Sequence, residues 1–240
     1  MNIRHCFTVI CAAALLTGAT GTAAQAKKSD TANGQDGLVK VRLHHLDVYL
    51  LPGTDFRRYT KVLLDQTQVV FRDDWIKNIN RSTRELSNRI NSADAERIVE
   101  EARTTFAEIF GSALKDAGFE IVTAPGADVL RLAPRVVDMY VNAPDKLTKA
   151  PLTRVFTVDA GQATLVLEIR DSTTGALIGR ATDHGTASLD GSSRLSRTSS
   201  VANRGEFEDL FRALAQASAK GLNELKVQPP LALTGQPAKQ

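Results

Sequence analysis

Residues 163–182, ATLVLEIRDSTTGALIGRAT, form the most constraining stretch of the chain, because two segments of alternating polarity flank a polar turn. In the first segment the two sides of an extended chain are Ala163, Leu165, Leu167 and Ile169, against Thr164, Val166, Glu168 and Arg170. A period of two is typical of a strand with one buried face. Turn-forming residues 171–175 end in glycine, and residues 176–182 return as a second strand. The pattern predicts a β-hairpin and contains no arrangement typical of catalysis.

Two stretches repeat apolar residues at helical spacing. The first, 92–117, has Ser92 as its expected N-cap, acidic residues in its first turn and Gly118 as its expected stop. Its apolar stripe comprises Ala95, Ile98, Val99, Ala102, Phe106, Ile109, Phe110, Ala113, Leu114 and Ala117. The second, 204–226, carries Phe207, Leu210, Phe211, Leu214, Ala217, Leu222 and Leu225. Each stripe predicts an amphipathic helix that must bury one side against another layer.

Three further segments predict strands. Residues 59–71 are mostly apolar, with an interruption near Asp65, and residues 119–123 form a short apolar segment. Residues 128–141 predict a long strand whose apolar set changes phase, which we place at Pro134 because proline in a sheet is confined to edges and bulges.

The segments between these elements predict loops. Residues 76–91 are polar and predict a loop with a short helical turn, and residues 142–151 predict a second loop. Residues 185–200 are small and charge-poor, so we expect a mobile or solvated segment. With two helices that each bury one stripe, the element order predicts an α+β fold. We expect a two-layer sandwich in which a mixed or antiparallel sheet of about five strands carries both helices on one face and a more polar opposite face.

The N-terminus predicts export. Arg4 and His5 begin a short positive region, residues 7–16 are apolar, and Ala24-Gln25-Ala26 ends a stretch of small residues. These are the three regions of a secretory signal peptide, with cleavage after Ala26 and a periplasmic location that is compatible with outer-membrane association. A membrane anchor is the alternative, but ten apolar residues cross only about half of a bilayer core.

The predicted organisation of the chain is a signal peptide over 1–26, a flexible tether over 27–37, one domain over 38–226 and a disordered tail over 227–240. No later stretch is apolar enough to cross a membrane, so no transmembrane span is expected after cleavage.

Both cysteines, Cys6 and Cys11, lie within the predicted signal peptide, so no disulfide or cysteine nucleophile is expected in the mature chain. A lipid anchor on Cys11 is not expected, because Val9 and Ile10 before it are bulky and the positive start is close. The formal net charge is +3, and the basic residues are scattered, which argues against a nucleic-acid partner.

Few residues are candidates for catalysis or for binding a ligand or metal. His44 and His45 are adjacent and chelate poorly on a strand, so we interpret them as a solvated pair. Trp75, the only tryptophan, could stack on a sugar or peptide, although closing a core edge is the more usual role. Asp183 and His184 lie near serines but without a Gly-x-Ser-x-Gly elbow, so a catalytic triad is not predicted.

No metal site, phosphate loop or dinucleotide fingerprint is present, and no cofactor is expected. The sequence therefore predicts no catalytic, cofactor-binding or metal-binding residue. Trp75, Asp183 and His184 remain weak candidates for a surface site.

Four stretches of the chain form a recognisable combination: Pro52–Trp75 (PGTDFRRYTKVLLDQTQVVFRDDW), residues 129–144 (VLRLAPRVVDMYVNAP), Gly161–Asp183 (GQATLVLEIRDSTTGALIGRATD) and Asn203–Leu225 (NRGEFEDLFRALAQASAKGLNEL). Together they resemble the DUF3313 family of bacterial envelope proteins. The PG-x-D-F-x-x-Y-T-K opening and the RDSxTG-like hairpin are the specific parts, and the likeness covers roughly residues 38–226. The resemblance implies a secreted, often lipid-anchored protein of undefined function and supplies no catalytic residues. The chain departs from it in having no convincing lipid-acceptor cysteine.

Three functional hypotheses follow. The first is a non-catalytic periplasmic module that binds an envelope protein or a second copy of itself. The second is a hydrolase that acts on envelope material around Trp75, Asp183 and His184. The third is a small-ligand carrier with a pocket between a helix and the sheet.

Overall fold

A computed structural model describes residues 36–43, 46–83, 86–142, 155–157, 159–188, 196–198 and 200–230. All of them belong to the compact unit Ala32–Gln240. Predictions for the signal peptide, for the tether before Asp36, for the tail beyond residue 230 and for His44 and His45 lie outside the described residues. So do those for the loop over 143–151 and for residues 189–195.

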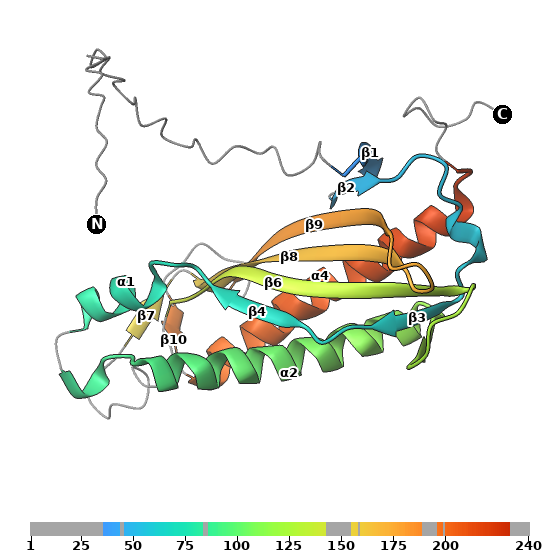
Figure 1. Cartoon of the computed structure of the whole chain (residues 1–240). Coiled ribbons are helices and arrows are strands. Elements are labelled where there is room, and N and C mark those ends of the chain that lie inside the picture. The colour runs from blue at the N-terminus through green and yellow to red at the C-terminus, as the bar shows by residue number, and fades with distance from the viewer. Residues whose placement is uncertain are drawn as a thin grey trace, which may run out of the picture. The chain divides into compact units, whose positions relative to one another are not determined.

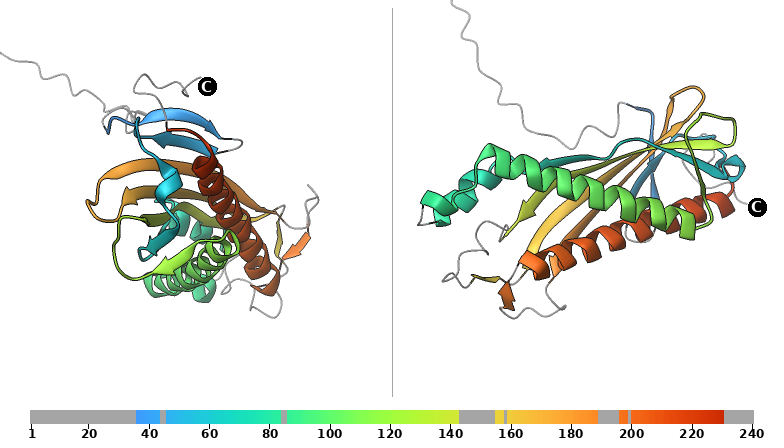
Figure 2. Two further views of the ribbon diagram at one scale, coloured as in Figure 1. Left: turned by 90° about the vertical axis from the view of Figure 1, so that its right-hand side faces the viewer. Right: turned by 90° about the horizontal axis from the view of Figure 1, so that it is seen from below.

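The predicted α+β class is confirmed. A mixed sheet forms one layer, and the two long helices α2 (Ser92–Asp116) and α4 (Ser200–Val227) run along the same face of it (Figures 1 and 2). The sheet has eight strands rather than about five. Its order is β1 (Val39–Leu43), β2 (Leu46–Leu50), β9 (Leu177–Ser188), β8 (Asp159–Asp171), β6 (Val129–Val141), β3 (Lys61–Leu64) and β5 (Glu120–Val122), with β4 (Gln68–Phe71) also paired to β6.

The predicted hairpin is confirmed as β8 and β9, which pair antiparallel with Leu167 opposite Ala181. The four apolar residues predicted to face inward, Ala163, Leu165, Leu167 and Ile169, are all at most 1% exposed. Their neighbours on the other side, from Thr164 to Arg170, are half-buried. The alternation in sequence therefore identified the inner and outer faces of the sheet correctly.

The segment 59–71 is interrupted at Asp65, as predicted, and forms two short strands, β3 and β4. Both run parallel to β6, β3 beside residues 129–132 and β4 beside residues 135–139. Pro134, which has no N–H to donate, lies between these two pairings. The pairing of segment 59–71 with β6 is thus interrupted at the position where β6 has no N–H to donate.

The phase change of β6 does not occur at Pro134, and this prediction is wrong. Inward positions continue in register through Pro134 to Val136, and the pattern shifts at Asp138, where the pairing with β8 is irregular. Asp138 has φ of 52°, a left-handed conformation that aspartate tolerates better than most residues. The bulge therefore depends on a backbone angle, which the alternation of apolar residues does not reveal.

Other boundaries also differ from the predictions. The N-cap of α2 is Asn91, not Ser92, and it forms a reciprocal capping box with Asp94. The segment predicted as a loop begins with a helix, α1 (Trp75–Ser82), and residues 185–188 continue β9. Two further strands, β7 (Val155–Thr157) and β10 (Ser196–Thr198), pair antiparallel in a separate small sheet, and short 3-10 helices span Phe56–Arg58 and Leu86–Asn88.

The helices bury their stripes against the inner face of the sheet. Phe106 and Phe110 of α2 and Phe211 of α4 are at most 2% exposed, and the Phe106 ring meets the Phe211 ring edge-on, with centroids 5.3 Å apart. At Gly185 of β9, an added Cβ would lie 2.3 Å from Cδ1 of Leu210. The absence of a side chain at Gly185 therefore lets α4 pack directly on the sheet.

The two specific motifs of the family resemblance meet at the buried carboxylate of Asp171. Its Oδ2 accepts hydrogen bonds from the Tyr59 hydroxyl at 2.9 Å and from Nη2 of Arg58 at 2.7 Å. Its Oδ1 accepts from the N–H groups of Thr173 and Thr174, at 3.1 and 2.9 Å, which shapes the hairpin turn. The Thr174 N–H is the main reason, and the Tyr59 hydroxyl a further one, that the pKa of Asp171 is lowered to about 2.

We predict that Phe106→Ala lowers the free energy of unfolding by about 3–5 kcal/mol, because it leaves a cavity where the two layers meet. Glu108→Ala, an exposed change on the same helix, should cost less than about 0.5 kcal/mol. Thermal or denaturant unfolding of both variants measures the difference. Equal melting temperatures would mean that the α2 stripe does not face a core.

We predict that Asp171→Asn destabilises the protein by about 2 kcal/mol at neutral pH, because the folded pKa of about 2 lies below the ordinary value of 3.8. A carboxyl whose pKa is lower in the folded than in the unfolded state stabilises the fold at pH values above the unfolded pKa. This stabilisation is lost as the pH falls toward the folded pKa. The difference in free energy of unfolding between the wild type and the variant should thus be constant above about pH 4 and should narrow toward pH 2. Denaturant unfolding across this range, with the exposed Asp116→Asn as control, tests it; a gap that does not depend on pH would contradict it.

Candidate functional site

Trp75 is a core residue. Its side chain is fully buried, its ring stacks on Phe71 with centroids 3.8 Å apart, and its Nε1–H donates to the carbonyl of Val141 at 2.9 Å. The tryptophan thus fastens the start of α1 to the end of β6. Its burial agrees with the core-edge interpretation and removes it from any exposed surface.

Asp183 and His184 lie on opposite faces of the sheet. Asp183 is opposite the inward-facing Leu165, whereas His184 is opposite Thr164 on the outer face, where the Thr164 hydroxyl lies 2.9 Å from Nδ1 of the imidazole. Adjacent residues of a strand point to opposite sides, so this separation is a direct consequence of β9 being extended there. The structure therefore does not bring Trp75, Asp183 and His184 together into one site.

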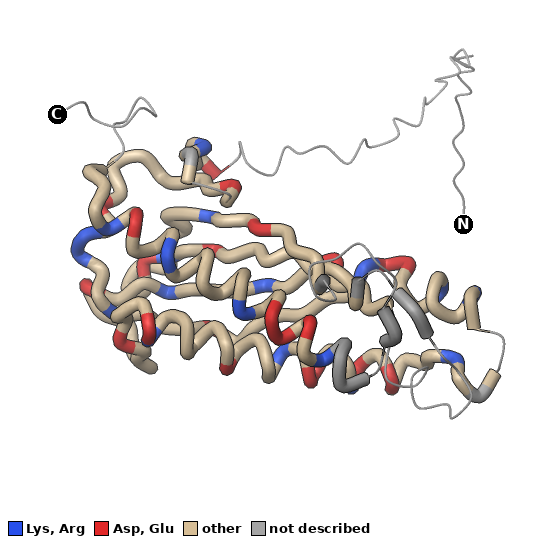
Figure 3. Tube along the Cα trace, turned by 180° about the vertical axis from the view of Figure 1, so that it is seen from behind, with Lys and Arg blue, Asp and Glu red and all other residues tan. Residues whose placement is uncertain are grey.

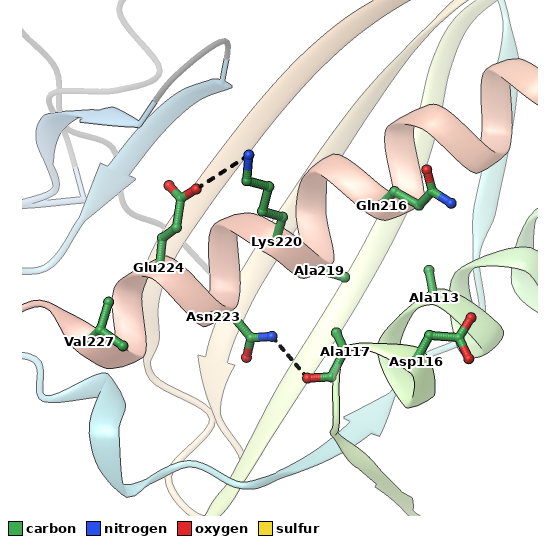
Figure 4. A pocket seen from close by; sticks show the side chains of 9 residues that line it. All are labelled: Ala113, Asp116, Ala117, Gln216, Ala219, Lys220, Asn223, Glu224 and Val227. Atoms are coloured by element: carbon green, nitrogen blue, oxygen red, sulfur yellow. Dashed lines mark hydrogen bonds and ion pairs between the residues drawn. The ribbon is translucent and has the colours of Figure 1, made fainter.

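A shallow groove of about 460 Å³ runs between the C-terminal halves of α2 and α4 (Figure 4). It is lined mainly by small and amphipathic side chains, namely Ala113, Asp116, Ala117, Gln216, Ala219, Lys220, Asn223, Glu224 and Val227. Asn223 donates from Nδ2 to the carbonyl of Ala117 at 2.9 Å, and Lys220 lies 3.9 Å from Glu224. The Asn223 hydrogen bond fastens α4 to the end of α2, whereas the Lys220–Glu224 pair lies along α4 itself.

A second open groove, of about 690 Å³, lies between β4 and the N-terminal half of α2. Its lining includes Val69, Val99 and the paired Glu100 and Arg103. Thr67 is buried beside it, and its Oγ1 has no hydrogen-bond partner among the described residues. Both grooves are open to solvent, and the second lies between a helix and the sheet, where the carrier hypothesis places its pocket.

A third candidate surface is the outer side of β6, β8 and β9, which we call the open face. It consists of the residues that alternate with the buried ones: Arg131, Ala133, Arg135 and Val137 of β6, Thr164, Val166, Glu168 and Arg170 of β8, and Arg180, Thr182, His184 and Thr186 of β9. Four arginines against one glutamate give this set a net charge of +3. The long helices pack on the other side of the sheet, so these side chains are left uncovered by them (Figure 2).

Several charges of the open face are paired with neighbours. Arg131 donates to the Asp65 carboxylate at 2.9 Å, and Glu168 receives Arg170 at 2.8 Å and Arg180 at 3.6 Å. Figure 3 shows that acidic and basic residues are interspersed along the described part of the chain trace, on strands as well as helices. The positive character of the open face is therefore local and modest.

The described residues contain no cluster of three or more histidine, cysteine, aspartate or glutamate side chains arranged to hold a metal ion. Among the same residues, no helix is both long and apolar enough to cross a membrane.

The sequence placed Arg131, Arg135, Glu168 and Arg170 on the polar side of their strands but did not bring them together. Arg131 and Arg170 belong to different strands and become neighbours only because β6 pairs with β8 in the register that sets them opposite each other. Period-two alternation reveals which side a residue faces, whereas the order of strands depends on long-range pairing. The open face could therefore be found from sequence only strand by strand.

The solved structures that this chain is similar to share little sequence with it. PelC from Paraburkholderia phytofirmans, solved as a dodecamer, is 15% identical, with 72% of this chain and 96% of that chain covered and a TM-score of 0.36. A DUF330-family protein from Xanthomonas campestris is 14% identical, with 75% and 90% covered and a TM-score of 0.37. A neuraminyllactose-binding hemagglutinin homologue from Helicobacter pylori is 12% identical, with 73% and 91% covered and a TM-score of 0.36. Likenesses at this level do not establish a shared function.

The family, in contrast, is established by sequence. No curated protein matches the chain significantly. A family model described as "Protein of unknown function (DUF3313)" matches residues 27–218 and so spans nearly all of the domain expected from the sequence. The match also includes the PG-x-D-F opening and the hairpin turn, the two motifs that meet at Asp171. The chain therefore belongs to the DUF3313 family.

Proposed function

We propose that this chain is an exported, non-catalytic binding module of the bacterial cell envelope. The observation that carries the proposal is the open face, a broad sheet surface that mixes charged, polar and apolar side chains and over which neither long helix packs. Surfaces of mixed polarity that are wide rather than deep suit a protein partner better than a small substrate.

The residues that the hydrolase hypothesis requires are not arranged for it. A general acid or base must reach the reacting group together with its partner, within hydrogen-bond distance or through one water. Asp183 faces the helix side, whereas His184 faces outward, where its imidazole lies against the hydroxyl of Thr164. This geometry supports a binding role for the open face over a catalytic one.

The export part of the proposal rests on the N-terminal sequence. The positive start, the ten-residue apolar run of 7–16 and the small residues before Lys27 are the features that a signal peptidase requires. In the proposed arrangement the mature chain begins at Lys27, and a tether to Gly37 leads into β1 at one edge of the sheet.

We predict that the protein purified from the periplasmic fraction begins at Lys27. N-terminal sequencing and intact-mass measurement of that fraction test it, with whole-cell extract as the control. Retention of Met1, or a mass increase that corresponds to a lipid on Cys11, would contradict the proposed processing.

Binding through the open face can be tested by site-specific photo-crosslinking in intact cells. A photoreactive residue at position 184, on the open face, should give a discrete adduct, whereas the same residue at position 108, on the exposed side of α2, should not. Adducts from position 108 alone would place the binding surface on the helix layer and contradict the proposal.

The catalytic alternative makes the opposite prediction for Asp183, which lies on the helix side of the sheet and not on the open face. We expect Asp183→Asn to leave any cellular phenotype of the gene unchanged, because this residue takes no part in binding through the open face. Complementation of a deletion strain measures this, with protein abundance checked by immunoblot. Loss of the phenotype at normal abundance would favour the hydrolase.

A further inference from the structure

We propose that the open face binds a protein partner that presents carboxylates, and that Arg135 receives one of them. This inference rests on the proposed function and deepens it, because it names the chemistry of the partner. It follows from the position of one arginine, from the pairing of the other arginines and from the apolar side chains around it.

Arg135 stands near the middle of the open face. It lies opposite Val166 of β8 on one side and opposite Gln68 of β4 on the other, and its side chain is exposed. No described residue forms an ion pair or hydrogen bond with its guanidinium.

The other arginines of the open face already have carboxylate partners. Arg131 pairs with Asp65, and Arg170 pairs with Glu168. Arg180 reaches Glu168 and also pairs with Asp36 at 3.0 Å. Of the four open-face arginines, Arg135 is therefore the one whose positive charge is not neutralised by a carboxylate of the described residues. A partner that supplies a carboxylate at this position would complement the charge.

Apolar side chains flank Arg135 along β6 and directly across on β8. Ala133, Val137 and Val166 are half-buried next to it, and Val70 of β4, on the same side of the sheet, is 47% exposed. An arginine flanked by apolar side chains is a common composition for the centre of a protein interface. The planar guanidinium can accept a carboxylate through two parallel hydrogen bonds, which the surrounding apolar contacts would shield from water.

A protein fits this surface better than an anionic membrane does. Recognition of acidic lipids usually takes clusters of about 4–8 lysines or arginines. The open face has no lysine, and Glu168 at its centre would repel a uniformly negative surface. The mixed charges and the valines instead match a partner that presents one or two carboxylates among apolar side chains.

The test starts from the photo-crosslinked adduct at position 184, formed in cells that express the full-length chain. Arg135→Glu should reduce the adduct by at least about tenfold, because a charge pair at an interface centre becomes a like-charge contact. Arg97→Glu, the same reversal at an exposed and unpaired arginine of α2, should change it less than about twofold. Replacing the partner's carboxylate, mapped by mass spectrometry of the adduct, with arginine should restore the adduct to the Arg135→Glu variant.

Different outcomes separate this inference from the proposed function. An adduct that persists in the folded Arg135→Glu variant would overturn the acidic-partner inference but leave a binding role for the open face intact. An adduct with twice the mass of the chain would replace the partner protein with a second copy. The purified protein could instead sediment with phosphatidylglycerol vesicles and not with phosphatidylcholine vesicles. If Arg135→Glu abolished this sedimentation, the partner would be an anionic membrane and not a protein. Circular dichroism of each variant confirms that it folds.

Discussion

The antiparallel pairing of β6, β8 and β9 is the constraint on which the rest of the structure depends. These long strands alternate between a side that must be buried and a side that need not be, and α2 and α4 cover the first side with their apolar stripes. The apolar residues on the inner side are thereby buried between the layers, while Asp183 on the same side is half-buried. A function that needs fully exposed side chains is therefore left to the outer side, an edge strand or the outer surface of the helices.

The Asp171 carboxylate links this sheet to the chain that precedes β3. Because Asp171 ends β8 and Tyr59 lies just before β3, their hydrogen bond joins segments 112 residues apart. The same carboxylate organises the hairpin turn through Thr173 and Thr174. One buried anion with several donors is stable where an unpaired one would not be, since its desolvation is offset by charge-assisted hydrogen bonds. The two most specific family motifs are therefore explained by folding, with no need for a catalytic role.

Local patterns in the sequence were sufficient for the fold class, the hairpin and the two long helices, because burial of one side imposes a period that can be read residue by residue. These patterns did not predict features that depend on something other than the period of the apolar residues. The bulge depends on the positive φ of Asp138, and Asn91 rather than Ser92 caps α2 because its side chain reaches the N–H of Asp94. The strand count also exceeded the expectation, because residues 59–71 divide into two short strands and because β1 and β2 extend the sheet beyond β9.

The candidate site illustrates the same limit more sharply. Adjacency in sequence suggested that Asp183 and His184 act together, but in an extended strand adjacency guarantees that two side chains face opposite ways. Residues that do share a surface, such as Arg135 and Val166, are separated by about thirty positions and meet through strand pairing. Where strands alternate this regularly, the side chains that share a surface come from neighbouring strands and not from adjacent positions of one strand. Pairing register, and not motif spacing, therefore decides which side chains a partner meets on the open face.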